Sequence, residues 1–103
     1  LPRPKPKASQ LLQNYPNPFN PETWIPFQLA KPARMRIHIY APSGRLVRTL
    51  DLGYRGAGFY TSRPEAAYWD GRNETGERVS SGLYFYQLQT DHFSVMRRMV
   101  ILK

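Results

Sequence analysis

Residues 68–88, YWDGRNETGERVSSGLYFYQL, decide the fold of this 103-residue chain. The first part of the stretch is rich in Gly and polar residues that form turns. The last part, residues 83–88, alternates with period two and carries aromatic side chains, which is typical of a β-strand. The stretch predicts a turn followed by a strand, and it contains no catalytic motif. We expect structural roles for four of its residues, Trp69 in closing a core and Asp70, Gly71 and Gly76 in turning the chain.

The preceding segment predicts a hairpin. Residues 33–40, ARMRIHIY, alternate apolar and polar side chains, so one face should be core and the other should meet water. The tetrapeptide 41–44, APSG, has Pro at its second position and Gly at its fourth, as a type I turn prefers. The chain should then return through residues 45–50. The side chains expected in the core are Met35, Ile37 and Ile39, and those expected outside are Arg34, Arg36, His38 and Tyr40.

Prolines restrict the segments nearer the N-terminus. Residues 11–21, LLQNYPNPFNP, contain three prolines, and the residue before each proline is held in extended geometry. We expect an irregular segment that covers a sheet edge and is fixed by Pro16, Asn17 and Pro18. Residues 23–29, TWIPFQL, should be an edge strand or a strand start because of their proline. Their inward side chains should be Ile25, Phe27 and Leu29, and their outward ones Trp24, Pro26 and Gln28.

The C-terminal part predicts a second hairpin, in which residues 83–89 and 93–102 are joined by a tight turn. Residues 51–63 are punctuated by three glycines, which favours a loop with one short strand at Phe59 and Tyr60. The chain thus has about seven short strands with turns at regular spacing. This pattern predicts an all-β sandwich of the immunoglobulin or fibronectin type III kind in residues 11–103.

The composition limits the chemistry that is available. The chain has no Cys, which excludes disulfides, thiolate catalysis and Cys-based zinc sites. Its formal charge of +8 indicates an anionic partner such as a surface polysaccharide, with a merely soluble basic surface as the alternative. No nucleic-acid-binding motif is present, so we expect no nucleic-acid partner. No apolar run approaches the ~20 residues of a membrane span.

Residues 1–10 predict an extended arm or linker, because Pro alternates with other residues in LPRPKPKA. Ordering a residue costs roughly 1 to 2 kcal/mol of backbone entropy. Offsetting even ~10 kcal/mol needs on the order of 400 Å² of apolar contact. We expect the arm not to find that area on its own domain, which makes a neighbouring subunit a candidate. The arm residues expected at such a contact are Leu1, Pro2, Pro4 and Pro6.

Four motifs follow one another along the chain: YPNPFNPET at 15–23, IYAPSGRLVRTL at 39–50, WDGRNETGERVSSGLYFYQL at 69–88 and RRMVILK at 97–103. Together they resemble the type A C-terminal sorting domain of bacterial type IX secretion substrates. That family is itself similar to the immunoglobulin-like domain of flagellar hook-capping proteins. The resemblance covers residues 11–103. One departure is Ala41 and Pro42, where the family often carries Asp or Asn after the tyrosine.

The resemblance implies a non-catalytic export-directing β-sandwich at the end of a larger secreted protein, without a cofactor. Its partner would be the outer-membrane secretion machinery, and its location the extracellular space or the cell surface, reached through the periplasm. Many members are then removed by a cysteine transpeptidase, which attaches the cargo to surface lipopolysaccharide. By matching position, the recognition region would include Gly82, Tyr84, Arg97, Arg98 and Lys103.

Other functions remain open at this stage. A self-assembling subunit of an extracellular filament is the first alternative, with the proline arm docked on a neighbouring subunit. A carbohydrate-binding module is the second, because exposed aromatic rings stack on sugars, although packing in the core is their commoner role. The rings considered for that platform are Trp24, Trp69, Tyr84 and Tyr86.

The loop after Trp69 carries oxygen ligands of the kind that hold Ca²⁺, although their spacing differs from that of an EF-hand. Because Asp-Gly turns are common in β proteins, the favoured interpretation is a turn without metal. The weak candidate ligands are Asp70, Asn73, Glu74 and Glu77. His38 and His92 lie far apart in the sequence, and neither has a nucleophile pattern beside it. We therefore expect no enzyme activity.

Overall fold

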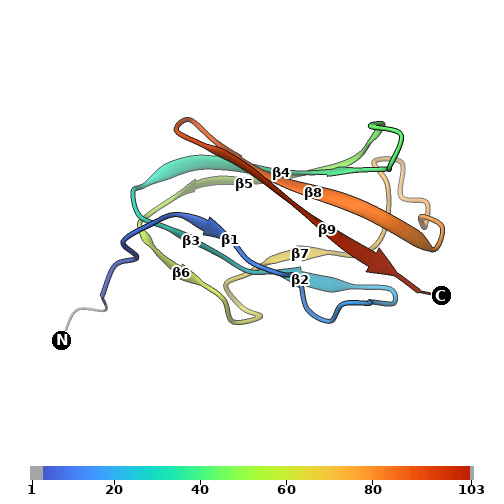
Figure 1. Cartoon of the computed structure of the whole chain (residues 1–103), viewed down its shortest axis with the longest axis horizontal. Helices are drawn as coiled ribbons and strands as arrows, with labels where there is room; N and C mark the ends of the chain where they lie inside the picture. The colour runs from blue at the N-terminus through green and yellow to red at the C-terminus, as the bar shows by residue number, and fades with distance from the viewer. Residues whose placement is uncertain (1–3, 103) are drawn as a thin grey trace.

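The longest strands form one four-stranded antiparallel sheet, which makes up one layer of the molecule (Figure 1). The computed structural model of the chain describes residues 4–102. The strand order in this sheet is β5-β4-β8-β9, so β9 lies at one edge. The bounds of the four strands are β4 Ala33–Tyr40, β5 Leu46–Arg55, β8 Gly82–Thr90 and β9 Ser94–Ile101.

Five short strands build the opposite layer (Figure 1). They form two small sheets, of order β1-β3-β6 and β2-β7. Their bounds are β1 Gln10–Leu11, β2 Thr23–Ile25, β3 Phe27–Leu29, β6 Gly58–Tyr60 and β7 Ala67–Trp69. The two layers confirm the predicted all-β sandwich. The described residues form nine strands instead of about seven, because β1 is added and residues 23–29 are divided in two.

Pro26 causes that division. Proline has no amide hydrogen, so it cannot donate to a neighbouring strand. The chain changes partners there, since β2 pairs with β7 while β3 lies between β1 and β6. Of the two predicted alternatives, an edge strand holds for β2, whereas a strand start holds for β3, which begins directly after Pro26 and has a neighbour on both sides. Pro26 is also buried and not outward-facing, whereas the inward positions of Ile25 and Phe27 are confirmed.

The first long hairpin agrees with the sequence at its start and departs from it later. The burial pattern of β4 alternates from end to end, and the Gly44 amide donates to the Ala41 carbonyl at 2.9 Å in the turn. The predicted loop from residue 51 is wrong, because β5 continues to Arg55. An extra residue enters β5 where Met35 pairs with Gly53 and Arg36 pairs with Asp51. Gly53 has a φ of 68°, a conformation that glycine adopts without strain, so the strand continues past the irregularity.

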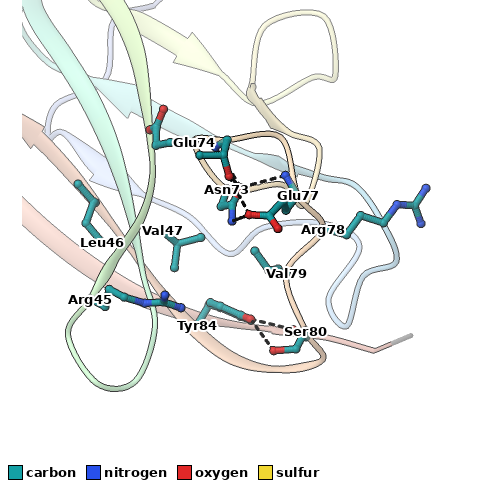
Figure 2. A pocket seen from close by; sticks show the side chains of 11 residues that line it. Arg45, Leu46, Val47, Asn73, Glu74, Glu77, Arg78, Val79, Ser80 and Tyr84 are labelled. Carbon is teal, nitrogen blue, oxygen red and sulfur yellow. Dashed lines mark hydrogen bonds between the residues drawn. The ribbon is translucent and has the colours of Figure 1, made fainter.

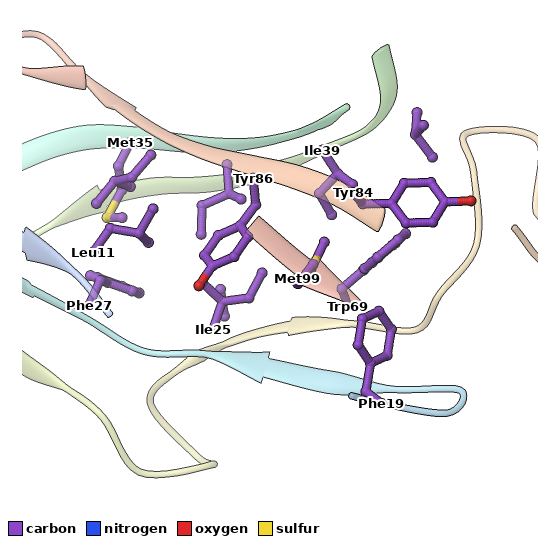
Figure 3. Packing of buried hydrophobic residues seen from close by; sticks show 14 of the residues in the cluster. Leu11, Phe19, Ile25, Phe27, Met35, Ile39, Trp69, Tyr84, Tyr86 and Met99 are labelled. Carbon is purple, nitrogen blue, oxygen red and sulfur yellow. The ribbon is translucent and has the colours of Figure 1, made fainter. Parts of the chain in front are cut away.

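The core lies between the two layers (Figure 3). Trp69 is fully buried, and its ring centroid lies 5.6 Å from that of Phe19 and 6.2 Å from that of Tyr84. The expectation that Trp69 closes the core is confirmed. Tyr86 is also fully buried, and its ring stands between the sheets. Aromatic rings of this size dominate the burial of apolar surface in a small domain.

The irregular segment 11–21 covers the edge of the sandwich, as predicted. The Tyr86 hydroxyl donates to the Leu12 carbonyl at 2.8 Å and accepts from the Asn14 amide at 3.0 Å. The buried Asn14 side chain donates to the Thr23 hydroxyl at 2.9 Å. Buried polar groups are stable only when they are hydrogen-bonded, so these contacts fix the path of the segment.

Candidate functional site

The proline-rich segment 11–21 covers the C-terminal half of the outer edge of β9. The Val100 amide donates to the Asn17 side-chain oxygen at 3.0 Å, and the Val100 carbonyl accepts from the Phe19 amide at 3.0 Å. The Gln13 side chain donates to the Arg98 carbonyl at 3.0 Å. Gln13, Asn17 and Phe19 therefore hydrogen-bond to backbone groups of β9 that would otherwise face water or another chain.

The N-terminal half of the same edge is open. The β8–β9 register runs without a shift from Gly82↔Ile101 to Gln89↔Ser94. Because backbone groups alternate in direction along a strand, Ser94 and Met96 present their amides and carbonyls to the same side as Val100. These amides and carbonyls point away from β8. Among residues 4–102, no other segment hydrogen-bonds to them. Both residues are exposed, so this half of the edge is accessible.

Two arginines flank this edge on opposite faces of the sheet. Arg98 lies opposite Phe85 on the outer face, and Arg97 lies opposite the buried Tyr86 on the core side. The Arg97 guanidinium reaches the Leu11 carbonyl at 3.4 Å, a long hydrogen bond. Burial raises the pKa of Tyr86 above its usual value, and the nearby Arg97 charge partly opposes that increase. Within residues 4–102, the Arg98 side chain has no hydrogen bond or ion pair.

The outer face of the four-stranded sheet carries exposed apolar side chains between basic ones. The cross-strand pairs fix which residues share this face, such as Arg34 with Tyr54 and Phe85 with Arg98. The exposed large hydrophobic side chains on it are Leu46, Tyr54, Leu83 and Met96. Arg36 on this face lies 4.0 Å from Asp51, a pair that is about half exposed and therefore weak. An apolar surface with a basic rim is typical of a docking face.

A groove of about 450 Å³ opens at one end of the sandwich, between the start of β5 and the loop 73–80 (Figure 2). Its apolar floor includes Val47, Val79 and the Tyr84 ring. Tyr84 is 6% exposed, and its hydroxyl donates to the Ser80 carbonyl at 2.8 Å. The Tyr84 ring therefore borders the surface at this groove.

The structure separates the positions that the resemblance grouped together. Gly82 and Tyr84 lie at the start of β8 by the groove, whereas Arg97 and Arg98 lie in the middle of β9. The side chain of Tyr84 faces the core, and that of Arg98 faces outward. Lys103, the remaining predicted recognition residue, lies outside the described residues.

The loop after Trp69 is held together by its own hydrogen bonds. Asp70 accepts from the Arg48 guanidinium at 3.1 Å and from the Arg72 amide at 3.0 Å. Gly71 and Gly76 are turn positions, where the Gly71 carbonyl accepts from the Val79 amide at 3.0 Å. Both glycines have positive φ, at 78° and 87°.

The weak candidate metal ligands in this loop are held by hydrogen bonds within the chain. Glu74 accepts from the Thr49 amide at 2.6 Å. Glu77 accepts from the Thr75 hydroxyl and the Asn73 amide, and these hydrogen bonds lower the pKa of its carboxyl. In the part of the chain that the structure describes, no cluster of three or more His, Asp or Glu side chains has the geometry to hold a metal ion.

The N-terminal arm contacts its own domain. Pro6 is buried, so at least one proline ring of the arm finds a contact there. Pro4 is exposed and lines a shallow hollow with β6. The Ala8 carbonyl accepts from the Gln28 side chain at 2.9 Å. Leu1 and Pro2 lie outside the described residues, and a contact between the arm and a neighbouring subunit stays a prediction.

Core packing, the role favoured for the four rings over a sugar-stacking platform, is confirmed for three of them. Trp69, Tyr84 and Tyr86 are buried because they fill the core, and only Trp24 of the four rings reaches the surface. The Arg63 guanidinium covers the Trp24 ring at 4.3 Å from its centroid.

The histidines lie apart in the structure as well. The His38 ring lies within hydrogen-bond distance of Thr49 and Gln89, at 3.2 and 3.1 Å. His92 is exposed in the β8–β9 turn.

No helix in residues 4–102 is long and apolar enough to cross a membrane.

Two residues of this edge were missed by sequence reasoning. Gln13 is an unremarkable polar residue in the sequence, and nothing in it signals a contact with Arg98. Met96 does carry a signal, because it is an apolar side chain at an outward position between Ser94 and Arg98. The signal is weak, because singly exposed apolar residues are common on protein surfaces.

The comparisons with known proteins agree on the fold. The chain is similar to part of dimeric latent PorU from Porphyromonas gingivalis, with a TM-score of 0.70 and 18% identity over 91% of this chain and 9% of PorU. It is also similar to part of PorZ from the same organism, described as an essential bacterial surface component of the type-IX secretion system. That TM-score is 0.61, with 21% identity over 88% of this chain and 11% of PorZ.

The chain thus spans about a tenth of each of these two structures, and identities this low show a shared fold only. The search of curated proteins found no match. A family model described as the FlgD Ig-like domain matches residues 17–92, which is well over half of the chain. The chain therefore belongs to the FlgD Ig-like domain family.

Proposed function

We propose that this chain is a non-catalytic sorting domain, which directs a larger protein through the type IX secretion system and to the cell surface. The observation that carries the proposal is the β8–β9 hairpin. It contains four of the five positions that match the recognition region of sorting domains, and it presents an open strand edge beside exposed Arg98. The fold shared with PorZ, a component of that secretion system, supports the same assignment.

The proposed partner is the outer-membrane secretion machinery, which the domain meets after export into the periplasm. A recognition domain needs a surface that stays accessible while its core remains folded. The hairpin meets both needs, because Met99 and Ile101 of β9 are buried while Met96 and Arg98 are exposed. Recognition at the hairpin would require no chemistry from the domain itself.

The experiment is a fusion of the whole 103-residue chain to the C-terminus of a periplasmic reporter, expressed in a bacterium that has this secretion system. We expect the reporter on the cell surface or in the medium. The first control is the same fusion in a strain without a functional type IX translocon, in which the reporter should stay in the periplasm. Retention of the reporter in the wild-type strain would refute the proposal.

A pair of charge-reversal variants locates the recognition surface. Arg98→Glu changes the β9 edge, and Arg34→Glu makes the same change of charge on β4, away from that edge. Both side chains are exposed, so neither variant should change the free energy of unfolding by more than about 0.5 kcal/mol. We expect export to fall only for Arg98→Glu. Equal export of the two variants would exclude the edge as the recognition surface.

A further inference from the structure

We propose that the open half of the β9 edge, from Ser94 to the amide of Arg98, binds an extended acidic segment of a partner protein as a fifth strand of the sheet. This inference rests on the proposed function and names the chemistry of the partner that would bind the hairpin.

The backbone of the edge supplies the first argument. Ser94 and Met96 each present an amide and a carbonyl away from β8, and no other described segment pairs with them. The sealed half shows that this edge does hydrogen-bond to a neighbouring chain segment, because the Val100 amide donates to Asn17 and the Arg98 carbonyl accepts from Gln13. A strand laid along residues 94–98 would continue that pattern, and main-chain hydrogen bonds of this kind bind extended peptides.

Charge supplies the second argument, and it decides between partners. Strands β8 and β9 contain two arginines and no acidic residue. The arginines lie on opposite faces at the same edge, so a strand added there would pass between two positive charges. Pairing with β9 of a second copy would bring four arginines together, and basic side chains at sheet edges oppose such self-association. An acidic segment would be attracted by these arginines, whereas a second copy of β9 would be repelled by them.

A shallow hollow beside the edge supplies the third argument. Phe85, Met96, Arg97 and Arg98 line it, and its volume is about 340 Å³. Met96 is 50% exposed there, which leaves its apolar surface in contact with water. Side chains two residues apart on an added strand would share a face. The segment that fits best therefore has an acidic residue beside Arg98 and an apolar residue two positions away, beside Met96.

The test uses a synthetic peptide, acetylated and amidated at its ends, with the sequence SVEEVEVS. It is titrated into the uniformly ¹⁵N-labelled 103-residue chain at low salt, and amide chemical shifts are followed by NMR. One control peptide has Lys in place of each Glu. A second control has Pro in place of its first two Val, which keeps the charge but removes backbone donors.

We expect saturable binding of the Glu peptide, with the largest shifts at Ser94, Met96 and Arg98. Hydrogen exchange of the Met96 amide should slow when the peptide is bound, because that amide becomes a hydrogen-bond donor. Neither control peptide should bind at the same concentration. Equal binding of the Pro peptide would overturn the inference, because it would show attraction between charges without strand pairing.

Variants of the chain locate the site independently. Arg98→Glu should weaken binding about tenfold or more, and Arg34→Glu less than about threefold. Met96→Pro removes an amide that points away from β8, and proline is tolerated at such edge positions, so the fold should persist while binding is lost. Met96→Ala keeps the amide and should retain most of the binding. If Met96→Pro fails to fold, the comparison of Arg98→Glu with Arg34→Glu still tests the site. Equal binding of the two variants would overturn the inference.

The outcome is separable from that of the proposed function. Normal export of the reporter together with no peptide binding, or binding outside residues 94–98, would contradict this inference alone. Loss of export in the wild-type fusion would contradict the sorting function, whatever the peptide does.

Discussion

The two halves of the β9 edge belong to one strand with one alternation, yet they meet different surroundings. At Val100, the edge is closed by Asn17 and Phe19, an irregular segment that is not itself a strand. At Met96, the edge is open and is flanked by arginines. The difference shows two ways to protect a sheet edge, by covering it with a proline-rich segment or by placing charge beside it. Only the second way leaves backbone groups available to a partner.

The largest effect should come from opening the sealed half. Phe19 is buried between the sheets beside Trp69, and its backbone bonds to Val100. Phe19→Ala should lower the free energy of unfolding by about 3 to 5 kcal/mol, because it leaves a cavity in the core. The measurement is urea unfolding at 25 °C, together with hydrogen exchange of the Val100 amide, which should speed up.

Phe19→Leu is the matched control for that prediction, since it keeps an apolar side chain and should lose clearly less stability. A cost below about 1 kcal/mol for Phe19→Ala would mean that the segment does not seal the core.

The next effect concerns Tyr86, whose hydroxyl hydrogen-bonds to the backbone of the segment 11–21 from inside the core. Tyr86→Phe removes the hydroxyl that bonds to Leu12 and Asn14, and should destabilise the chain by about 2 kcal/mol at pH 7. Burial raises the pKa of Tyr86 above 10, so the folded chain keeps a proton that the unfolded chain loses. The contribution of the protonated Tyr86 hydroxyl to the free energy of unfolding is therefore fully present below pH 10. It is lost as the pH rises through the raised pKa.

Urea unfolding between pH 8 and pH 11 tests this linkage. The free energy of unfolding should fall more steeply above pH 10 for the unaltered chain than for Tyr86→Phe. Parallel curves would show that the Tyr86 hydroxyl is not shielded from water in the folded state.

A smaller effect is expected at Asn17, which caps the edge from the side. Asn17→Ala removes the acceptor for the Val100 amide at a site that water reaches, so stability should fall by about 1 kcal/mol. Hydrogen exchange of the Val100 amide should then approach the rate of the Met96 amide. Unchanged protection of Val100 would mean that Phe19 alone seals the edge.

The sequence predicted what depends on local patterns. Alternation at residues 33–40 correctly identified the core face of β4, and Trp69 was correctly placed in the core. The continuation of β5 past Asp51 was missed, because it depends on pairing with β4 across an irregularity at Gly53. The division of residues 23–29 at Pro26 was missed because the partners on each side are distant in sequence.

The candidate site was predictable only in part. The basic pair Arg97 and Arg98 was visible in the sequence, but which half of β9 stays open depends on where the covering segment ends. That end point is set by tertiary hydrogen bonds between residues more than 80 positions apart, which a sequence pattern does not contain. Burial of Tyr84 agrees with the favoured expectation of core packing, but its separation from Arg98 was not visible in the sequence.

The most direct measurement of the account compares the two halves of the edge in one export assay with the reporter fusion. Asn17→Ala should lower the Tm and still be exported at a temperature at which it is folded. Arg98→Glu should keep the Tm of the unaltered chain and fail to be exported. Export of Arg98→Glu at the unaltered level, or loss of export for folded Asn17→Ala, would contradict the claim that the open half of β9 is the surface that the secretion machinery recognises.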